Sequence, residues 1–356
     1  MTARVPFAER GGRLRGVLDL ATGCYPAFLF GGSLGSLLPA FHFHDVTREW
    51  LEPRLQFLAD NGYRTMSCDE IAHVVIDGAR LAPRSVALTF DDAWESVWSV
   101  ALPLLKQYGL RAILFAIPSR IGENAGDSPF VTWTQLRNIH GSGVFDVQSH
   151  TRSHAMIFGG DEIVDFVRPG FEHEPLLNRP ITAMNGRVDT VGPAALGTPL
   201  YVRRSRMSDA RRYIADEDAA DRCRRHVAEH GGSRFFERPE WRRELQAIAL
   251  SGRGVFESDD ARVRTIRDEL ANGRALLNEQ LGTDTVKHVA LPWGISGTLT
   301  RQALDATGHV TAYAESPLRR RAIRAGDDRF CLMRLSGRFL TCLPGRGRQW
   351  FLTTVR

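Results

Sequence analysis

Two carboxylates stand side by side at the end of an apolar run in this chain. In the stretch SVALTFDDAWESVW, which begins at Ser85, Asp91 and Asp92 directly follow the apolar residues Val86 to Phe90. Adjacent negative charges at the end of a buried strand repel each other and lose hydration, so the pair needs compensation. Successive strand residues point to opposite sides, so the two aspartates need not do the same job. One can bind a divalent cation, and the other can take a proton from the water that this cation activates.

Two histidines further along the chain are candidate ligands for such a cation. His150 and His154, in SHTRSH, are spaced i, i+4, so one helical turn or a tight loop can aim both imidazoles at one point. Two imidazoles and a carboxylate are a common protein ligand set for catalytic zinc, and they leave positions open for water. Such a pair also occurs in surface and capping roles, but an acidic pair at another strand end favours a shared site.

The chemistry-bearing residues follow strands in an alternating pattern of strands and helices. The alternation predicts parallel strands with helical crossovers, and such folds place functional groups at the carboxyl ends of strands. Capping boxes at Ser67–Glu70 and Thr132–Gln135 open two of the helices. The expected strands cover 37–46, 85–90, 111–117, 144–150, 286–291, 309–314 and a last one near 329–335. The expected helices cover 47–61, 67–75, 94–108, 132–140, 208–230, 239–250, 258–281 and 298–307.

A long segment separates the two alternating blocks. Residues 155–257 begin with proline- and glycine-rich irregular sequence and become arginine-rich and helical. A loop of this length without a function of its own is uncommon in a compact domain. We therefore expect an N-terminal extension over 1–36 and a single catalytic domain over 37–356, interrupted by an insertion over 155–257 that covers one rim. A small separate subdomain is the alternative for this insertion.

Composition excludes some classes of partner. The 356 residues carry a formal charge of +5, with arginines dense at 203–243 and 318–324. These arginines indicate either solvated helix faces or attraction to an anionic partner, such as an acidic glycan or a phospholipid-linked sugar. No basic stripe has interleaved aromatic residues, which argues against nucleic acid.

The cysteines and the N-terminal sequence bear on the compartment. The five cysteines are scattered and form no CxxC pair, which argues against a disulfide scaffold and a thiolate zinc site and indicates a reducing compartment. The apolar stretch near the N-terminus is interrupted by Asp19, Pro26 and glycines, so it predicts neither a membrane-spanning helix nor a signal peptide. We therefore expect a cytoplasmic protein without a transmembrane segment.

The two motifs together resemble those of the polysaccharide deacetylase family, also called the NodB-homology family or carbohydrate esterase family 4. Thr89 to Asp92 matches the TFDD motif, and His150 to His154 matches H-[ST]-x-x-H. HVALPWG, at 288–294, is similar to the third motif. The stretches FHFHDV and ALPLLKQYGLRAILFAI resemble the subgroup that deacetylates poly-N-acetylglucosamine. The resemblance covers about 37–154 and 284–335.

This resemblance implies a fold, a cofactor and a set of roles. The fold is a distorted (β/α)7 barrel, and the cofactor is one divalent metal ion, foremost Zn2+, with Co2+, Ni2+ or Mn2+ as alternatives. The implied roles are metal ligation by Asp92, His150 and His154, general base for Asp91, general acid for His44, and substrate binding for Pro292, Trp293 and Gly294.

The sequence departs from the family pattern at three places. Ala93 replaces the glycine that usually follows the aspartates, and the third-motif arginine that orients the base has no match, because Ala290 and Leu291 occupy that region. The late Leu-x-His motif that usually supplies the acid is missing, since MRLSGRFL has no histidine. In the subgroup resembled here an N-terminal histidine takes that role, and His44 is the matching position, ahead of His42.

These observations favour a metal-dependent hydrolase that removes an N-acetyl group from an amino sugar or amino-sugar glycan, either free or linked to a carrier. One alternative is hydrolysis of another C–N bond, as in a formamide, a ureide or a cyclic amide. Another is a catalytically weak carbohydrate-binding relative, which the missing arginine and histidine favour and the intact Asp-Asp and His-x-x-x-His sets oppose. The sugar, the metal and the oligomeric state stay open at this point.

Overall fold

The structure is a computed structural model that describes residues 20–126, 128–183, 189–317 and 319–354. The chain divides into two compact units. Among the described residues, the barrel unit comprises 20–153, 268–296 and 301–354, and the insert unit comprises 154–267 and 297–300. The boundaries proposed from the sequence, with an insertion over 155–257 that covers a rim, stay a prediction.

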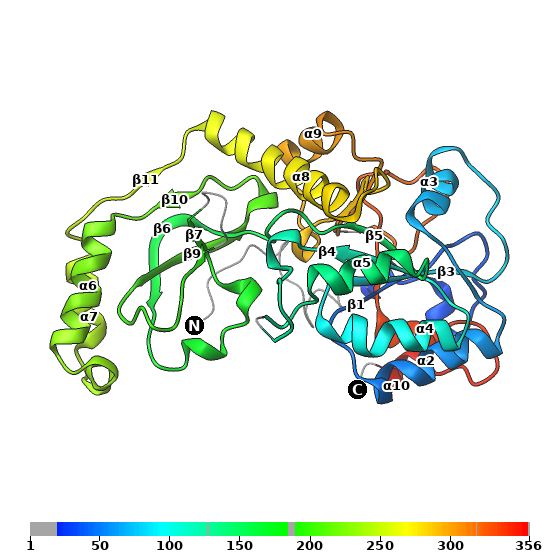
Figure 1. Cartoon of the computed structure of the whole chain (residues 1–356), viewed down its shortest axis with the longest axis horizontal. Helices are drawn as coiled ribbons and strands as arrows, with labels where there is room; N and C mark the ends of the chain where they lie inside the picture. Colours follow the sequence, from blue (N-terminus) through cyan, green and yellow to red (C-terminus); the bar gives the residue numbers. More distant parts are fainter. Residues whose placement is uncertain (1–19, 127, 184–188, 318, 355–356) are drawn as a thin grey trace. The chain divides into compact units, whose positions relative to one another are not determined.

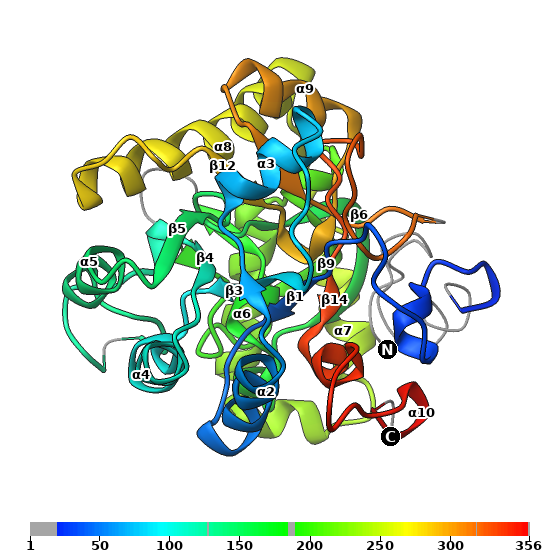
Figure 2. The same cartoon turned by 90° about the vertical axis from the view of Figure 1, so that its right-hand side faces the viewer.

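A parallel sheet organises the barrel unit. Its strands lie in the order β13-β12-β5-β4-β3-β1-β14, with β2 paired to β3, and every pairing is parallel. The run from β5 through β4, β3 and β1 to β14 can be followed in Figure 2. An isolated bridge between Tyr313 and Leu332 links β13 to the segment before β14. The fold is therefore the distorted seven-stranded α/β barrel that the sequence predicts. The strands are β1 (Ala40–Phe43), β2 (Arg64–Thr65), β3 (Ser85–Asp92), β4 (Ala112–Ala116), β5 (Phe145–Ser149), β12 (His288–Ala290), β13 (Thr311–Tyr313) and β14 (Leu335–Ser336).

Alternate residues of β3 pack into different hydrophobic clusters. Leu88 and Phe90 belong to the large cluster that includes residues of α2, α4 and α5, whereas Ala87 packs in a second cluster with Phe115 and Tyr313. The period of two along a strand places Asp91 on the same face as Ala87. Every residue of β3 is buried, so Asp91 lies at the end of a strand that is fully enclosed by the core.

The helices of the barrel unit follow the expected positions closely. The two predicted capping boxes are present: the side chains of Ser67 and Thr132 each accept a hydrogen bond from the backbone N–H of the residue three positions on, and the side chain of that residue accepts one from the backbone N–H of Ser67 or Thr132. The helix expected over 94–108 begins instead with a π-helical turn, η3 (Val97–Ala101). Pro103, which has no N–H to donate, follows directly in the first turn of α4. The helices of the barrel unit are α2 (Arg48–Asp60), α3 (Cys68–Ile76), α4 (Leu102–Gln107), α5 (Trp133–Gly141) and α10 (Phe351–Thr354). Two more helices, α8 (Asp259–Leu281) and α9 (Thr298–Ala306), have residues in both units.

The last strand differs from its prediction. Strand pairing is confined to β14 at Leu335–Ser336, which overlaps only the last residue of the expected range near 329–335. Residues 319–333 instead form an irregular segment that contributes Leu332 to the bridge with Tyr313. The apolar residues CLM at 331–333 are buried in this segment.

The insert unit is built around an antiparallel pair of strands and two helices (Figure 1). β6 (Met156–Phe166) pairs with β9 (Pro199–Ser205). The helix expected over 208–230 begins only at α6 (Glu217–Glu229), because β10 (Tyr213–Ile214) comes first and pairs with β11 (Val255–Phe256). The remaining elements are α7 (Trp241–Ala249), β7 (Ile181–Ala183) and β8 (Asp189–Thr190).

All five cysteines are buried free thiols. Four lie in the barrel unit and one, Cys223, lies in the insert unit. Burial raises the pKa of the Cys223 thiol to about 11 and that of Cys68 well above its ordinary value. Among the residues described, no helix combines the length and the apolar character needed to cross a bilayer.

Candidate functional site

Asp91 lies at the carboxyl end of β3 and is held by an arginine. Arg334 donates two hydrogen bonds to its carboxylate, from Nη1 to Oδ1 at 2.6 Å and from Nη2 to Oδ2 at 2.8 Å. Arg334 Nη1 also donates to Thr89 Oγ1 at 3.0 Å. Burial alone would raise the pKa of Asp91, but the Arg334 guanidinium outweighs it and holds that pKa below its usual range. Asp91 is therefore an oriented, ionised carboxylate.

Arg334 itself sits among aromatic rings. Its guanidinium carbon lies 5.7 Å from the ring centroid of Phe115 and 5.8 Å from that of Tyr313. Aromatic faces attract guanidinium cations at this range. The side chain of Arg334 is only 11% exposed, so the Asp91–Arg334 pair is fully part of the interior.

Asp92 adopts a different geometry from its neighbour. Its φ is +71°, and that of Ala93 is +62°, so the chain turns in the left-handed region directly after β3. Trp94 Nε1 donates to Asp92 Oδ2 at 2.9 Å, while Asp92 Oδ1 lies 3.5 Å from His150 Nε2. Burial raises the pKa of Asp92, an effect that the nearby His150 opposes. This is the environment of a carboxylate whose charge needs a cation.

His150 and His154 lie in the short segment that follows β5. His150 N–H donates to Ala116 O, and its Nδ1 donates to Ala290 O, each at 2.8 Å. A bond of this kind from the second ring nitrogen is the usual way in which a metal-ligating histidine is oriented. Both histidines are buried.

The donor set of Asp92, His150 and His154 fits one divalent ion. One ligand atom from each lies within 4.8 Å of the other two, and all three residues are buried. With zinc–ligand bonds of about 2.0–2.2 Å, adjacent ligand atoms of a tetrahedral site lie about 3.4 Å apart. The 3.5 Å between Asp92 Oδ1 and His150 Nε2 matches that spacing. The structure thus brings together the three residues predicted as ligands.

His44, the predicted acid, lies at the mouth of the same site. Its Nε2 is 3.9 Å from Asp91 Oδ2, and its side chain is 52% exposed. The ring of His42 packs edge-on against it, with centroids 5.6 Å apart. His42 is the more enclosed of the two histidines. This burial, together with the charge of Arg334, lowers the pKa of His42 to about 3. The structure thus brings a partly exposed imidazole next to the Asp91 carboxylate.

The third motif forms a tight turn, η9 (Pro292–Gly294), after β12. Trp293 has φ +54° inside this turn. Gly294 is closely packed, since a Cβ there would lie 2.6 Å from Cγ of Glu315. The substrate-binding role of these three residues stays a prediction. The backbone carbonyl of Ala290, just before this turn, accepts the hydrogen bond from His150 Nδ1.

The sequence interpretation missed Arg334. The sequence offers no arginine near the third motif as a partner for Asp91, and the structure supplies Arg334 from just before β14. The available signal was a lone arginine between Met333 and Leu335 in an apolar run, because an arginine buried there needs an anionic partner. The pattern gave no indication of which of the chain's carboxylates that partner would be.

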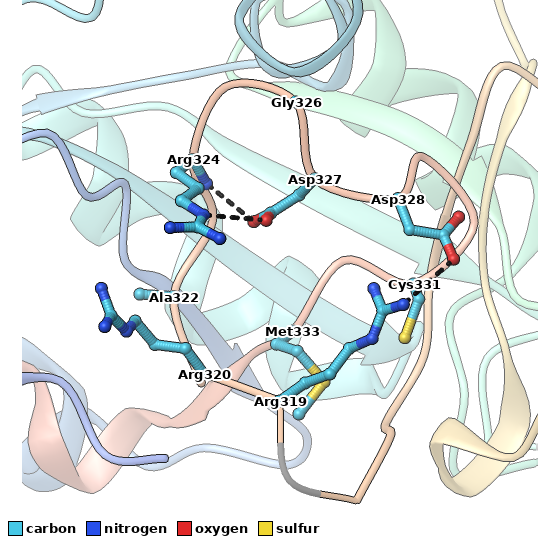
Figure 3. Close-up of a pocket in the computed structure, with 9 residues that line it drawn as sticks. All are labelled: Arg319, Arg320, Ala322, Arg324, Gly326, Asp327, Asp328, Cys331 and Met333. Carbon is cyan, nitrogen blue, oxygen red and sulfur yellow. Dashed lines mark hydrogen bonds and ion pairs between the residues drawn. The ribbon is translucent and has the colours of Figure 1, made fainter. Parts of the chain in front are cut away.

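An arginine-lined cavity of about 570 Å³ lies in the segment between β13 and β14 (Figure 3). Arg324 pairs with Asp327 at 3.3 Å, and Arg319 with Asp328 at 3.7 Å. Arg320 forms no ion pair with any residue that the structure describes. The lining therefore holds three guanidinium groups and two carboxylates. It consists of Arg319, Arg320, Ala322, Arg324, Gly326, Asp327, Asp328, Cys331 and Met333.

Comparisons with known proteins agree with this site. Residues 78–165, which contain both TFDD and SHTRSH, match the family model described as polysaccharide deacetylase. YxkH of Bacillus subtilis (strain 168), named as a polysaccharide deacetylase, is 27% identical over 130 residues, covering 34% of this chain and 45% of YxkH. The poly-beta-1,6-N-acetyl-D-glucosamine N-deacetylase of Escherichia coli (strain K12) is 28% identical over 120 residues, covering 31% of this chain and 18% of that protein. The matches thus span less than half the length of these curated relatives.

Solved structures share the fold. IcaB from Ammonifex degensii superposes with a TM-score of 0.50 at 18% identity, covering 85% of this chain and 92% of that one. A de-N-acetylase from Aggregatibacter actinomycetemcomitans gives a TM-score of 0.51 at 16% identity, covering 84% of this chain and 95% of that one. Residues 78–165 of this chain, which carry the Asp-Asp and His-x-x-x-His motifs, are thus similar to the polysaccharide deacetylase family in sequence, and the chain shares its fold with solved deacetylases.

Proposed function

We propose that this chain is a metal-dependent N-deacetylase that hydrolyses the N-acetyl group of an amino sugar in a glycan. The observation that carries the proposal is the juxtaposition at the end of β3. Asp91 is ionised and held by Arg334, and it neighbours a buried Asp-His-His set that fits a divalent ion. Base and ligand set are the two components that amide hydrolysis by activated water requires.

Asp92, His150 and His154 would hold the metal. When bound, a divalent ion lowers the pKa of water and polarises a carbonyl oxygen. The residues around the ligands orient them: Ala290 O fixes the His150 ring, and Trp94 Nε1 fixes the Asp92 carboxylate.

Asp91 and His44 are the proposed proton carriers. Asp91 accepts a proton from the attacking water, whose oxygen adds to the amide carbon. Arg334 keeps the Asp91 carboxylate ionised and fixes the direction of its oxygens. As the C–N bond breaks, His44 donates a proton to the nitrogen, which leaves as the amine of the sugar. The 3.9 Å between His44 Nε2 and Asp91 Oδ2 supports this assignment of two neighbouring proton carriers.

Metal analysis combined with an acetate-release assay tests the proposal. We expect near-stoichiometric divalent metal, and acetate release from N-acetylglucosamine oligomers that chelation abolishes and Zn2+, Co2+, Ni2+ or Mn2+ restores. Asp91→Asn is expected to retain the metal and to lose turnover by at least about 100-fold. Full activity in Asp91→Asn would eliminate Asp91 as the base.

The same assay separates the alternative functions. Turnover of a formamide, a ureide or a cyclic amide in preference to N-acetyl sugars would assign another C–N bond. Retention of glycan without release of acid would indicate a carbohydrate-binding protein. Arg334 weakens the case for the latter, because it supplies the orienting arginine that the motif pattern lacks.

The cavity of Arg319, Arg320 and Arg324 supports a further part of the proposal, that the substrate is linked to an anionic carrier. Its volume lies in the range of small-molecule sites, and Arg320 has a guanidinium available for a phosphate. We expect nucleotide- or lipid-linked N-acetyl sugars to be deacetylated faster than uncharged oligomers of the same length. Arg320→Ala should remove that difference, and preference of the parent protein for long uncharged polymer would reject the carrier.

The proposal includes a cytoplasmic location of the protein. A carrier-linked substrate fits the cytoplasmic location expected from the sequence. Fractionation of cells that produce the protein with an epitope tag tests this, and recovery outside the cytoplasm would overturn it.

A further inference from the structure

The five residues from His150 to His154 adopt a backbone that needs support. Thr151 has φ +64° and His154 has φ +53°. The left-handed region is unfavourable for residues other than glycine, and for a β-branched residue such as threonine it is a clear outlier. Such strain persists only where the surroundings over-determine the conformation. Something must therefore hold this segment, which we call the histidine loop.

Helix α8 supplies that support through Glu269. The carboxylate of Glu269 accepts from Ser153 Oγ at 2.6 Å and from Ser153 N–H at 3.0 Å. Its backbone carbonyl accepts from Arg152 N–H at 2.8 Å. Glu269 and Ser153 are each 3% exposed, so these bonds form without competition from solvent. On the other side of the loop, Ser119 N–H donates to Arg152 O at 3.1 Å.

Gly273, one helical turn after Glu269, lets α8 approach this closely. A Cβ at Gly273 would lie 2.7 Å from Arg152 N, 2.9 Å from Thr151 C and 3.1 Å from Ser149 Oγ. Two of these three atoms are backbone atoms of the histidine loop, so a side chain there would displace the loop or the helix. Residues at i and i+4 share one helix face, so Glu269 and Gly273 of the stretch ELANG lie on the same face of α8. On this face Glu269 supplies the carboxylate, and Gly273 leaves room for the backbone of the histidine loop.

We propose that the Glu269–Gly273 face of α8 is a positioning element that holds the histidine loop in its ligand-presenting conformation and thereby sets divalent-metal affinity. The inference rests on the proposed function, because it takes His150 and His154 as ligands. Glu269 touches neither substrate nor metal in this scheme. It restrains Ser153 and Arg152, which lie between the two histidines, and so fixes how the two imidazoles converge.

Metal affinity, measured in competition with a chromogenic chelator, tests the proposal without relying on turnover. For Zn2+ we expect Glu269→Ala to bind about 10–100-fold more weakly, the range typical of outer-shell partners of metal ligands. Ser153→Ala removes only the hydrogen bond from Ser153 Oγ to Glu269, so its Zn2+ affinity should fall less than that of Glu269→Ala. Gly273→Ala should resemble Glu269→Ala through steric displacement. Glu279→Ala, an exposed glutamate on the same helix, is the matched control and should bind like the parent.

The outcomes distinguish this inference from the proposed function. If the parent protein binds no divalent metal, the proposed function fails and the positioning role falls with it. If the parent binds Zn2+ and a folded Glu269→Ala or Gly273→Ala binds it equally well, only the positioning role is overturned. Circular dichroism of the metal-free variants reports folding. If Glu269→Ala does not fold, Ser153→Ala and Gly273→Ala decide, since unchanged affinity in both would refute the proposal.

Discussion

Replacing Arg334 with methionine removes the guanidinium from a carboxylate that has little access to water. The pair is 11% and 3% exposed at the side chains of Arg334 and Asp91, and its two hydrogen bonds are 2.6 and 2.8 Å long. Loss of one partner from a buried ion pair costs about 3–5 kcal/mol, because the remaining charge is uncompensated. We therefore expect Arg334→Met to lower the free energy of unfolding by about 3–5 kcal/mol. We also expect it to lower kcat for deacetylation by about 100-fold, since the base loses its orientation.

A double-mutant cycle separates the energy of the Arg334–Asp91 contact from other effects of the two substitutions on the free energy of unfolding. Urea unfolding of metal-free protein gives the free energies for Arg334→Met, Asp91→Asn and the double variant. If both residues act through one contact, the double variant loses less than the sum of the single losses, with a coupling of about 1–3 kcal/mol. Arg334→Lys keeps the charge but not the two-pronged geometry, so it should recover stability more than kcat.

Additive losses within about 0.5 kcal/mol would refute the coupling. Parent-like kcat in Arg334→Met would likewise refute the orienting role. Arg301→Met serves as the matched control, because Arg301 pairs with Asp328 at 2.8 Å while its side chain is 39% exposed. Such half-exposed pairs contribute about 1 kcal/mol or less.

Three further perturbations address the ligands, the acid and the interior. Trp94→Phe removes the donor to Asp92 Oδ2, so Zn2+ affinity should fall about 10-fold in a chelator titration while urea stability changes little. His44→Asn should retain metal by elemental analysis and lose about 100-fold in acetate release; equal activity would exclude His44 as the acid. Burial, followed by the Arg274 charge, lowers the pKa of His309 to about 3 from 6.5. Below pH 6.5 only the unfolded state takes up this proton, so unfolding free energy should fall by up to about 1.4 kcal/mol per pH unit down to pH 3. His309→Asn should flatten that slope and the exposed His73→Asn should not.

Local signals predicted the frame of the site well. The apolar run before Asp91 becomes a fully buried strand, and the capping boxes at Ser67 and Thr132 open helices where their hydrogen bonds require. These features depend on residues within a few positions of one another. Because parallel strands bring their carboxyl ends together, the aspartates of β3 and the histidines after β5 could be expected at one place.

Features that depend on distant partners were not predictable in the same way. Arg334 meets Asp91 across 243 positions, and no pattern in MRLSGRFL identifies which carboxylate it will contact. The π-helical turn η3 likewise escaped prediction, because the apolar residues of 94–108 indicate a helix but not its hydrogen-bond spacing. Glu269 lies in an amphipathic stretch whose pattern indicates only a helix, and its burial against Ser153 emerges from packing.

The buried cysteine thiols allow local opening of the structure to be measured without an added label site. Each cysteine can react with an alkylating reagent only after the surrounding structure opens, so its labelling rate measures the free energy of that opening. The labelling rate of Cys223, in α6, measures opening of the insert unit, and that of Cys68, the first residue of α3, measures opening of the barrel unit. Equal opening free energies would mean that the two units unfold as one cooperative block. Faster labelling of Cys223 would mean that the insert unit opens while the part of the barrel unit around Cys68 stays folded.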